Sequence, residues 1–192
     1  MTDQEKFKEY NNKYCAWLKT DPKHFNQGLM KRWFEGPDFV MFYNQNLTYG
    51  TFSNFYPVNM SAEIISQDLK DVTVLTSEHL FQAAKFVDKN PEYAKAILQA
   101  KTPGQTAKMG RDRKVPGFAD NWDNKSFYVM LNIVREKVKV CPEFKTELLS
   151  TGNKFLIENT TPSNDCIWGC GIDGGGKNWL GIVLMIIRDE LK

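Results

Sequence analysis

Hydrophobic residues recur every three or four positions in several segments of the chain, a spacing that predicts amphipathic helices. The first helix carries aromatic residues at such steps and is expected to end at Asp21-Pro22, because the residue before proline disfavours the helical region. A short helical piece with Leu29, Trp33 and Phe34 is expected next, before Gly36-Pro37. The remaining predicted helices cover residues 77–87, 91–100, 102–110, 125–140, 144–150 and 178–191.

Short apolar runs at 39–43, 72–75 and 154–159 predict brief strands, and residues 164–178 read as a glycine-rich loop. Helices outweigh strands, so the sequence predicts an α+β fold: a helix-dominated single domain with a few short strands. Residues 1–36 are expected to form a helical N-terminal arm, packed on the body or mobile. Residues 37–192 are expected to form the main domain.

The composition is that of a globular protein, with 42% hydrophobic and 25% charged residues among 192. A net charge of +2 gives no reason to expect a protein that coats polyanions. The longest apolar run, residues 180–187, is far shorter than the roughly 20 residues that cross a bilayer. With no export signal at the polar N-terminus, we expect a cytoplasmic protein (nuclear in a eukaryote), reduced cysteines and no membrane partner.

No metal site is expected. Cys166 and Cys170 have half the ligands of a zinc site, but no second Cys/His pair accompanies them and the chain has only two His.

The segment from Thr76 to Phe86 is the most informative. At 100° per residue, a helix starting here places Glu78, Phe81, Gln82 and Lys85 on one stripe, while most of its remaining circumference is apolar. A carboxylate, an amide and an amine on a mostly buried helix favour a functional role. The alternative is an ordinary solvated stripe of polar side chains.

Two further segments are candidates for binding anions. Gly171–Lys177 has the spacing of a phosphate-binding loop, but Asn178 stands where that motif needs Ser or Thr, so nucleotide hydrolysis by a P-loop is not expected. What remains is an anion-binding loop at a helix N-terminus, or a glycine loop that only caps the helix. Arg111 and Arg113 are suited to gripping a phosphate, or form a solvated basic turn.

Loop tryptophans supply candidate surfaces for a planar ligand. Trp122, Trp168 and Trp179 lie in or beside segments rich in glycine, Asn and Asp. Such rings are typical of ligand platforms, although filling the core is the default role of tryptophan.

Six sequence blocks resemble the signature blocks of one family, in the same order along the chain. They are Phe52-Ser-Asn-Phe55, Thr76-Ser-Glu-His-x-Phe-Gln-Ala-x-Lys-Phe86, Met109-Gly-Arg-x-Arg113, Asn121-Trp122, Asn164-Asp-x-x-Trp168-Gly-x-Gly171 and Gly176-Lys-Asn-x-Leu-Gly181. From about residue 39 to 191 the chain resembles the NADAR or YbiA-like N-glycosidases. Residues 1–35 lie outside the resemblance.

The resemblance implies a YbiA-like fold and hydrolysis of the bond between ribose C1 and a base nitrogen, on a ribose that carries a 5′-phosphate. The preferred substrate is ADP-ribose attached to guanine, with ADP-ribosylated DNA or RNA as the partner. The alternatives are early riboflavin-pathway ribosylamino-pyrimidine phosphates and a non-catalytic ADP-ribose-binding module. Neither reaction implies a cofactor or a metal.

The resemblance also suggests roles for residues. The candidate catalytic residues are Glu78, Lys85 and Asp165: Glu78 as general acid/base, Lys85 as a Schiff-base nucleophile or as a partner of Glu78, and Asp165 as a second carboxylate. The candidate substrate-binding residues are Asn54, Phe55, Gln82, Arg111, Arg113, Trp122, Trp168, Gly169, Lys177 and Asn178.

Overall fold

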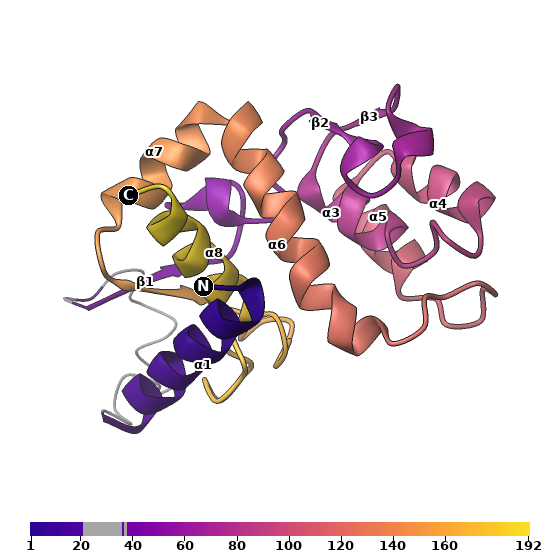
Figure 1. Ribbon diagram of the computed structural model, residues 1–192. Helices are drawn as coiled ribbons and strands as arrows, with labels where there is room; N and C mark the ends of the chain where they lie inside the picture. Colours follow the sequence, from indigo (N-terminus) through magenta and orange to yellow (C-terminus); the bar gives the residue numbers. More distant parts are fainter. Residues whose placement is uncertain (21–35, 37) are drawn as a thin grey trace. The chain divides into compact units, whose positions relative to one another are not determined.

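The structure is a computed structural model that describes residues 1–20, 36 and 38–192. The chain forms two compact units: unit 1 consists of residues 1–53 and 143–192, and unit 2 of residues 54–142. Helices dominate and the strands are few and short, so the predicted α+β class is confirmed (Figure 1). The helical piece expected around Leu29, Trp33 and Phe34 falls outside the described residues.

Unit 1 is built on two parallel strands, β1 (Phe39–Phe42) and β4 (Phe155–Glu158). Their register pairs Phe39 with Phe155 and Phe42 with Glu158. Helix α8 (Trp179–Glu190) packs on β4, and α1 (Asp3–Thr20) packs on α8 (Figure 1). The other elements of this part of the chain are η2 (Gly50–Phe52) and α7 (Pro142–Ser150), which begins at the boundary with unit 2.

Helix α1 ends at Thr20, next to the predicted stop at Asp21-Pro22. Its aromatic residues face the rest of unit 1: the Trp17 ring stacks on Phe155 with centroids 4.9 Å apart, and Trp17 Nε1 donates to Asp38 Oδ2 at 2.7 Å. Tyr14 is almost fully buried among the same rings. The aromatic spacing seen in the sequence is therefore the inner face of a docked helix.

Helix α8 is buried more completely than its sequence pattern predicted. The predicted inner face was Leu180, Val183, Leu184 and Ile187, but every residue from 180 to 188 is buried. The reason is that α8 packs on β4 and is also covered by α1. A helix enclosed in this way is apolar around most of its circumference.

Unit 2 consists of four α-helices and a small antiparallel ladder. Strand β2 (Met60–Ser61) pairs with β3 (Thr73–Val74), and two 3₁₀ turns, η3 (Ala62–Ile64) and η4 (Gln67–Leu69), lie between them. The helices are α3 (Ser77–Ala83), α4 (Pro91–Leu98), α5 (Pro103–Gly110) and α6 (Trp122–Val140). Helix α3 packs against each of the other three.

One predicted helix is shorter than expected. The segment predicted as helix over 77–87 is α-helical only to Ala83, after which Lys85 N–H and Phe86 N–H donate to carbonyls three residues back. The tighter turns carry Lys85 beyond the α-helix proper. The run predicted as a strand over 72–75 is limited to Thr73 and Val74.

In the part of the chain that the structure describes, no helix combines the length and hydrophobicity that a bilayer crossing requires.

Gly181 allows α8 to approach β4, because a Cβ at this position would lie 2.0 Å from the Leu156 carbonyl oxygen. We expect Gly181→Ala to lower the free energy of unfolding by about 1–3 kcal/mol, as overpacking does in cores. Urea denaturation measures the change. The control is Gly175→Ala in the preceding loop, where a Cβ meets nothing closer than 3.5 Å. Equal stability of the two variants would contradict this packing argument.

Candidate active site

A buried chain of hydrogen bonds links the three polar residues of the predicted stripe. Gln82 Nε2 donates to Glu78 Oε1 at 2.8 Å, and Lys85 Nζ donates to Gln82 Oε1. Lys85 Nζ also donates to the Gly110 carbonyl at 3.2 Å. Exposed fractions of 6% for Glu78, 3% for Gln82 and 7% for Lys85 exclude the solvated-stripe alternative.

Gln82 lies between the acid and the amine. Its amide donates to Glu78 and accepts from Lys85, so these two hydrogen bonds join the charged groups through a neutral bridge. Glu78 also acts on the charge of Lys85, so the pairing of the two residues that the sequence left open stays a prediction beside this bridge. The arrangement fixes the orientation of the Gln82 amide, because reversing it would face donor to donor and acceptor to acceptor.

The pKa of Lys85 is lowered to about 8, chiefly because the amine is buried; Glu78 opposes this shift, and the positive charges of Arg111 and Arg113 add to it. Removing the ammonium group from water disfavours its charged form. At neutral pH a measurable fraction of Lys85 is therefore a free amine. An amine in this state is able to act as a nucleophile or base.

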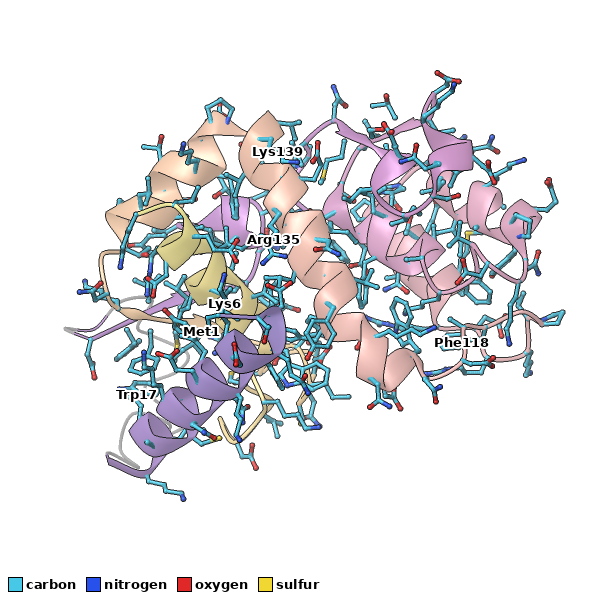
Figure 2. All side chains as sticks on the ribbon, viewed as in Figure 1. Met1, Lys6, Trp17, Phe118, Arg135 and Lys139 are labelled. Atoms are coloured by element: carbon cyan, nitrogen blue, oxygen red, sulfur yellow. The ribbon has the colours of Figure 1, made fainter. Side chains whose placement is uncertain are left out.

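Aromatic rings surround the amine on one side. Lys85 Nζ lies 5.3 Å from the ring centroid of Phe81 and 5.9 Å from that of Trp122. Phe118, labelled in Figure 2 on the segment before α6, meets Trp122 edge to face at 6.3 Å. The Arg113 guanidinium stacks on Phe118 at 3.8 Å. A cation and flat surfaces thus lie beside the buried polar chain.

The Asn54–Phe55 segment is attached to the start of α3. The Asn54 carbonyl accepts a hydrogen bond from Glu78 N–H at 3.1 Å, which fixes this loop beside the candidate acid. Both side chains are half-buried. Unit 2 therefore brings together Asn54, Phe55, Glu78, Gln82, Lys85, Arg111, Arg113 and Trp122.

The other candidates belong to unit 1. Asp165 Oδ1 accepts hydrogen bonds from the N–H groups of Ile167 and Trp168, both at 2.9 Å. This is the geometry of a carboxylate that orders its own loop. The Trp168 ring meets Trp179 edge to face at 5.8 Å, and Lys177 Nζ lies 5.1 Å from the Trp179 ring centroid.

The glycine loop does not have the geometry of a phosphate-binding loop. The six consecutive N–H groups of residues 175–180 all donate to oxygen atoms of residues 166–173. An anion at a helix N-terminus needs such groups to be available. The expected backbone anion site is thus not formed. The segment is instead a loop that caps the N-terminus of α8, which was the other alternative.

Asn178 and Gly169 are buried and contact other residues of unit 1. The Asn178 side chain is fully buried, donates to the Leu156 carbonyl at 2.8 Å and accepts from Glu158 N–H at 2.9 Å. Its φ of 52° is left-handed, a conformation that Asn tolerates. At Gly169 a Cβ would lie 2.2 Å from the Thr160 side chain. Asn178 thus joins the glycine loop to β4, and the Gly169 carbonyl accepts a hydrogen bond from Asn178 N–H at 3.1 Å.

The sequence placed Phe81 on the stripe of Glu78, Gln82 and Lys85 without giving it a role, and it assigned no such contact to Gly110 or Phe118. Gly110 supplies a carbonyl to Lys85, and its missing Cβ makes room for Gln82; Phe81 and Phe118 supply rings. A glycine after Met109 and phenylalanines in apolar surroundings carry no local signal of such roles. The packing of α3 against α5 reveals the role of Gly110, and the position of the segment before α6 reveals that of Phe118.

A sequence model of the NADAR domain matches residues 41–192. The chain belongs to the NADAR family. The match extends over both units and leaves α1 outside it. This finding confirms the family that the six sequence blocks indicated.

Relatives of this NADAR chain include N-glycosidase YbiA of Escherichia coli K12, 38% identical over 79% of this chain and 88% of the relative. A second is the chloroplastic riboflavin biosynthesis protein PYRR of maize, 34% identical over 79% of this chain but only 25% of that protein. The NMR structure of E. coli YbiA matches with a TM-score of 0.68 and 36% identity, over 82% of this chain and 86% of that one. The predicted YbiA-like fold is confirmed.

No group of three or more His, Cys, Asp or Glu side chains arranged to hold a metal ion occurs within residues 1–20, 36 and 38–192.

Gly110 offers a test of the buried chain, because a Cβ there would lie 2.0 Å from Gln82 Oε1. We expect Gly110→Ala to displace Gln82 and remove an acceptor from Lys85, which lowers the pKa of Lys85 below about 8. Side-chain NMR titration of Lys85 measures this change. Gly104→Ala is the matched control in the same helix, since its nearest neighbour is 4.0 Å away. Identical titration of both variants would contradict the role of Gly110.

Proposed function

We propose that this protein is an N-glycosidase that removes ADP-ribose from guanine in nucleic acid. The observation that carries the proposal is the buried chain Glu78–Gln82–Lys85, which places a carboxylate and an amine with a lowered pKa beside aromatic rings. Cleavage of a ribose C1–N bond needs an acid for the leaving nitrogen and a group that delivers or replaces water. The N-glycosidase name of the E. coli relative supports the same reaction class.

In direct hydrolysis, Glu78 in its acid form protonates the departing base nitrogen as the C1–N bond breaks. The electron pair of that bond leaves with the base, and positive charge develops on C1 and the ring oxygen. The resulting Glu78 carboxylate then takes a proton from water as the water oxygen bonds to C1. The products are free ADP-ribose and guanine, and Glu78 is again protonated.

In the covalent alternative, neutral Lys85 attacks C1. Its nitrogen forms a bond to C1 as the bond to the base nitrogen breaks, and Glu78 supplies the proton that the base needs. Opening of the sugar moves one proton from that nitrogen to the ring oxygen and gives a protonated Schiff base. Water adds to C1 and the bond from C1 to the lysine nitrogen breaks, which releases ADP-ribose and the Lys85 ammonium group; this group returns a proton to Glu78. The lowered pKa of Lys85 supports this route.

Substrate contacts are proposed for side chains, since the loop N–H groups are occupied. Arg111 and Arg113 are exposed and suit the diphosphate of ADP-ribose. Trp122 and Phe55, in the same unit as the buried chain, are proposed to contact rings. Trp168 and Lys177 belong to unit 1, and the substrate contacts predicted for them from the sequence stay predictions. We assign no substrate contact to Asn178 or Gly169, and Asp165 is proposed to order the loop that carries Trp168.

Charge favours a nucleic-acid substrate over a small one. Residues 108–114 carry four exposed cationic side chains and one exposed carboxylate: Lys108, Arg111, Arg113 and Lys114 against Asp112. A short basic segment beside a buried catalytic chain suits a polyanion that presents one modified base to the site.

A second candidate is hydrolysis of early riboflavin-pathway intermediates, ribosylamino-pyrimidine phosphates. It is favoured by the maize relative, whose name places that protein in riboflavin biosynthesis. Side-by-side assays of the purified protein on ADP-ribosylated guanine DNA and on those intermediates decide between the two. Turnover of the riboflavin intermediates alone would overturn the nucleic-acid proposal.

We expect Glu78→Gln and Lys85→Met each to lower kcat/KM by about 10²–10⁴-fold, the range typical of lost acid–base groups. Circular dichroism establishes that each variant is folded. Lys89→Met is the matched control. Lys89 follows Lys85 closely in the chain, but its amine is exposed and forms an ion pair with Asp120. If Glu78→Gln still turned over substrate at the wild-type rate, the assigned acid would be wrong. If the wild type and both variants bound ADP-ribose equally well and none of them cleaved the substrate, the protein would be a binding module.

The pH dependence distinguishes the two routes. If neutral Lys85 is the nucleophile, kcat/KM rises as pH increases through about 8, because deprotonation creates the reactive amine. Gln82→Glu places a negative charge beside Lys85, raises its pKa and moves this rise to higher pH. Borohydride added during turnover should trap ADP-ribose on Lys85. An unmodified lysine and a rate that does not rise with pH would favour direct hydrolysis.

A further inference from the structure

The loop between α5 and α6 carries a cation stacked on an aromatic ring. The Arg113 guanidinium carbon lies over the Phe118 ring, 3.8 Å from its centroid, a van der Waals contact that requires the two planar groups to approach flat. Phe118, labelled in Figure 2, is half-buried, whereas Arg113 is exposed. The ring therefore covers one face of the guanidinium, and the opposite face is open to solvent.

The Arg113 head group is held in place without an acceptor for its N–H groups. Among the described residues, no carboxylate or carbonyl forms an ion pair or a hydrogen bond with this guanidinium. The neighbouring Asp112 carboxylate accepts instead from Lys114 N–H at 3.0 Å. An arginine fixed by stacking alone keeps its donors and one planar face available to a ligand.

The stacked pair lies one ring away from the candidate catalytic amine. Phe118 meets Trp122 edge to face at 6.3 Å, and the Trp122 ring centroid lies 5.9 Å from Lys85 Nζ. The backbone fixes this arrangement, because Ala119 N–H donates to the Lys85 carbonyl at 2.7 Å. All of these residues belong to unit 2. Arg113 therefore has a defined place close to the site where the modified nucleotide is expected.

We propose that the open face of Arg113 binds, by stacking, the nucleobase next to the modified guanine, with Phe118 as its backing. Bases of single-stranded nucleic acid stack on guanidinium planes and aromatic rings with little regard to sequence. A guanidinium donates within its own plane, so stacking on its face leaves its N–H groups for the diphosphate. The inference rests on the proposed function, and it makes an oligonucleotide a better substrate than a single modified nucleoside.

The test measures kcat/KM on two substrates with the same ADP-ribosylated guanine: a single nucleoside and the central nucleotide of a single-stranded trinucleotide. We expect the wild type to favour the trinucleotide, and Arg113→Lys to lower the ratio of the two values by about 5–100-fold. Lysine keeps the charge but offers no plane for stacking. A lost diphosphate contact cancels in the ratio, because both substrates contain that group.

Two further measurements locate the contact. Phe118→Leu removes the backing ring and should lower the same ratio, whereas Phe118→Tyr keeps the ring and should restore it. An abasic residue is placed in the trinucleotide on each side of the modified guanine in turn. On one of the two sides it should lower kcat/KM of the wild type but not that of Arg113→Lys, because both changes remove one interaction.

Arg111→Lys is the matched control, because Arg111 is exposed in the same segment and no ring of the described residues stacks on it. It should lower both values and keep their ratio. An equal ratio in wild type and Arg113→Lys, or an equal fall in Arg111→Lys, would overturn the inference, and cleavage of the single nucleoside would leave the proposed function standing. If the wild type cleaved neither substrate, the proposed function would fail and the inference with it.

Discussion

The organisation of unit 2 follows from the burial of one amine. An ammonium group removed from water is stable only when its donors find acceptors. Lys85 has the Gln82 amide oxygen and the Gly110 carbonyl. These two partners dictate that α5 lies close to α3 and that position 110 has no side chain. The lowered pKa of Lys85 is a consequence of the same burial.

Unit 1 is governed by the pairing of backbone groups at the start of α8. The N–H groups that a helix leaves without intrahelical partners are here occupied by the loop of residues 166–173. The Asn178 side chain ties this loop to β4, because it donates to the Leu156 carbonyl and accepts from Glu158 N–H. The blocks shared with the family in this unit therefore include residues that build the loop, so membership of a motif is not by itself a sign of ligand contact.

Local patterns predicted the helices well. The periodic segments at α1, α4, α5, α6 and α8 were recognised because amphipathic spacing and proline or glycine at the ends are local signals. It was harder to predict the two-residue strands β2 and β3 and the early end of α3. These features depend on pairing and packing between distant segments.

In the candidate site, too, local spacing was informative and contacts between side chains were not predictable. Helical geometry alone placed Glu78, Gln82 and Lys85 on one stripe, and the hydrogen bonds bear this out. The order of the contacts, with Gln82 between the charges, depends on rotamers that no spacing encodes. For the glycine-rich segment the sequence left an anion-binding loop and a helix-capping loop both open, because composition does not tell whether the backbone N–H groups already have partners.

The burial of α8 shows which residues outside the family domain help to cover its apolar surface. The matched family domain starts at residue 41, yet α1, at residues 3–20, covers one side of an almost wholly apolar helix. A recombinant fragment cut at the domain border would leave that side of α8 open to water. Exposed apolar surface of this kind promotes self-association. The part of the chain that keeps α8 covered is accordingly longer than the family domain.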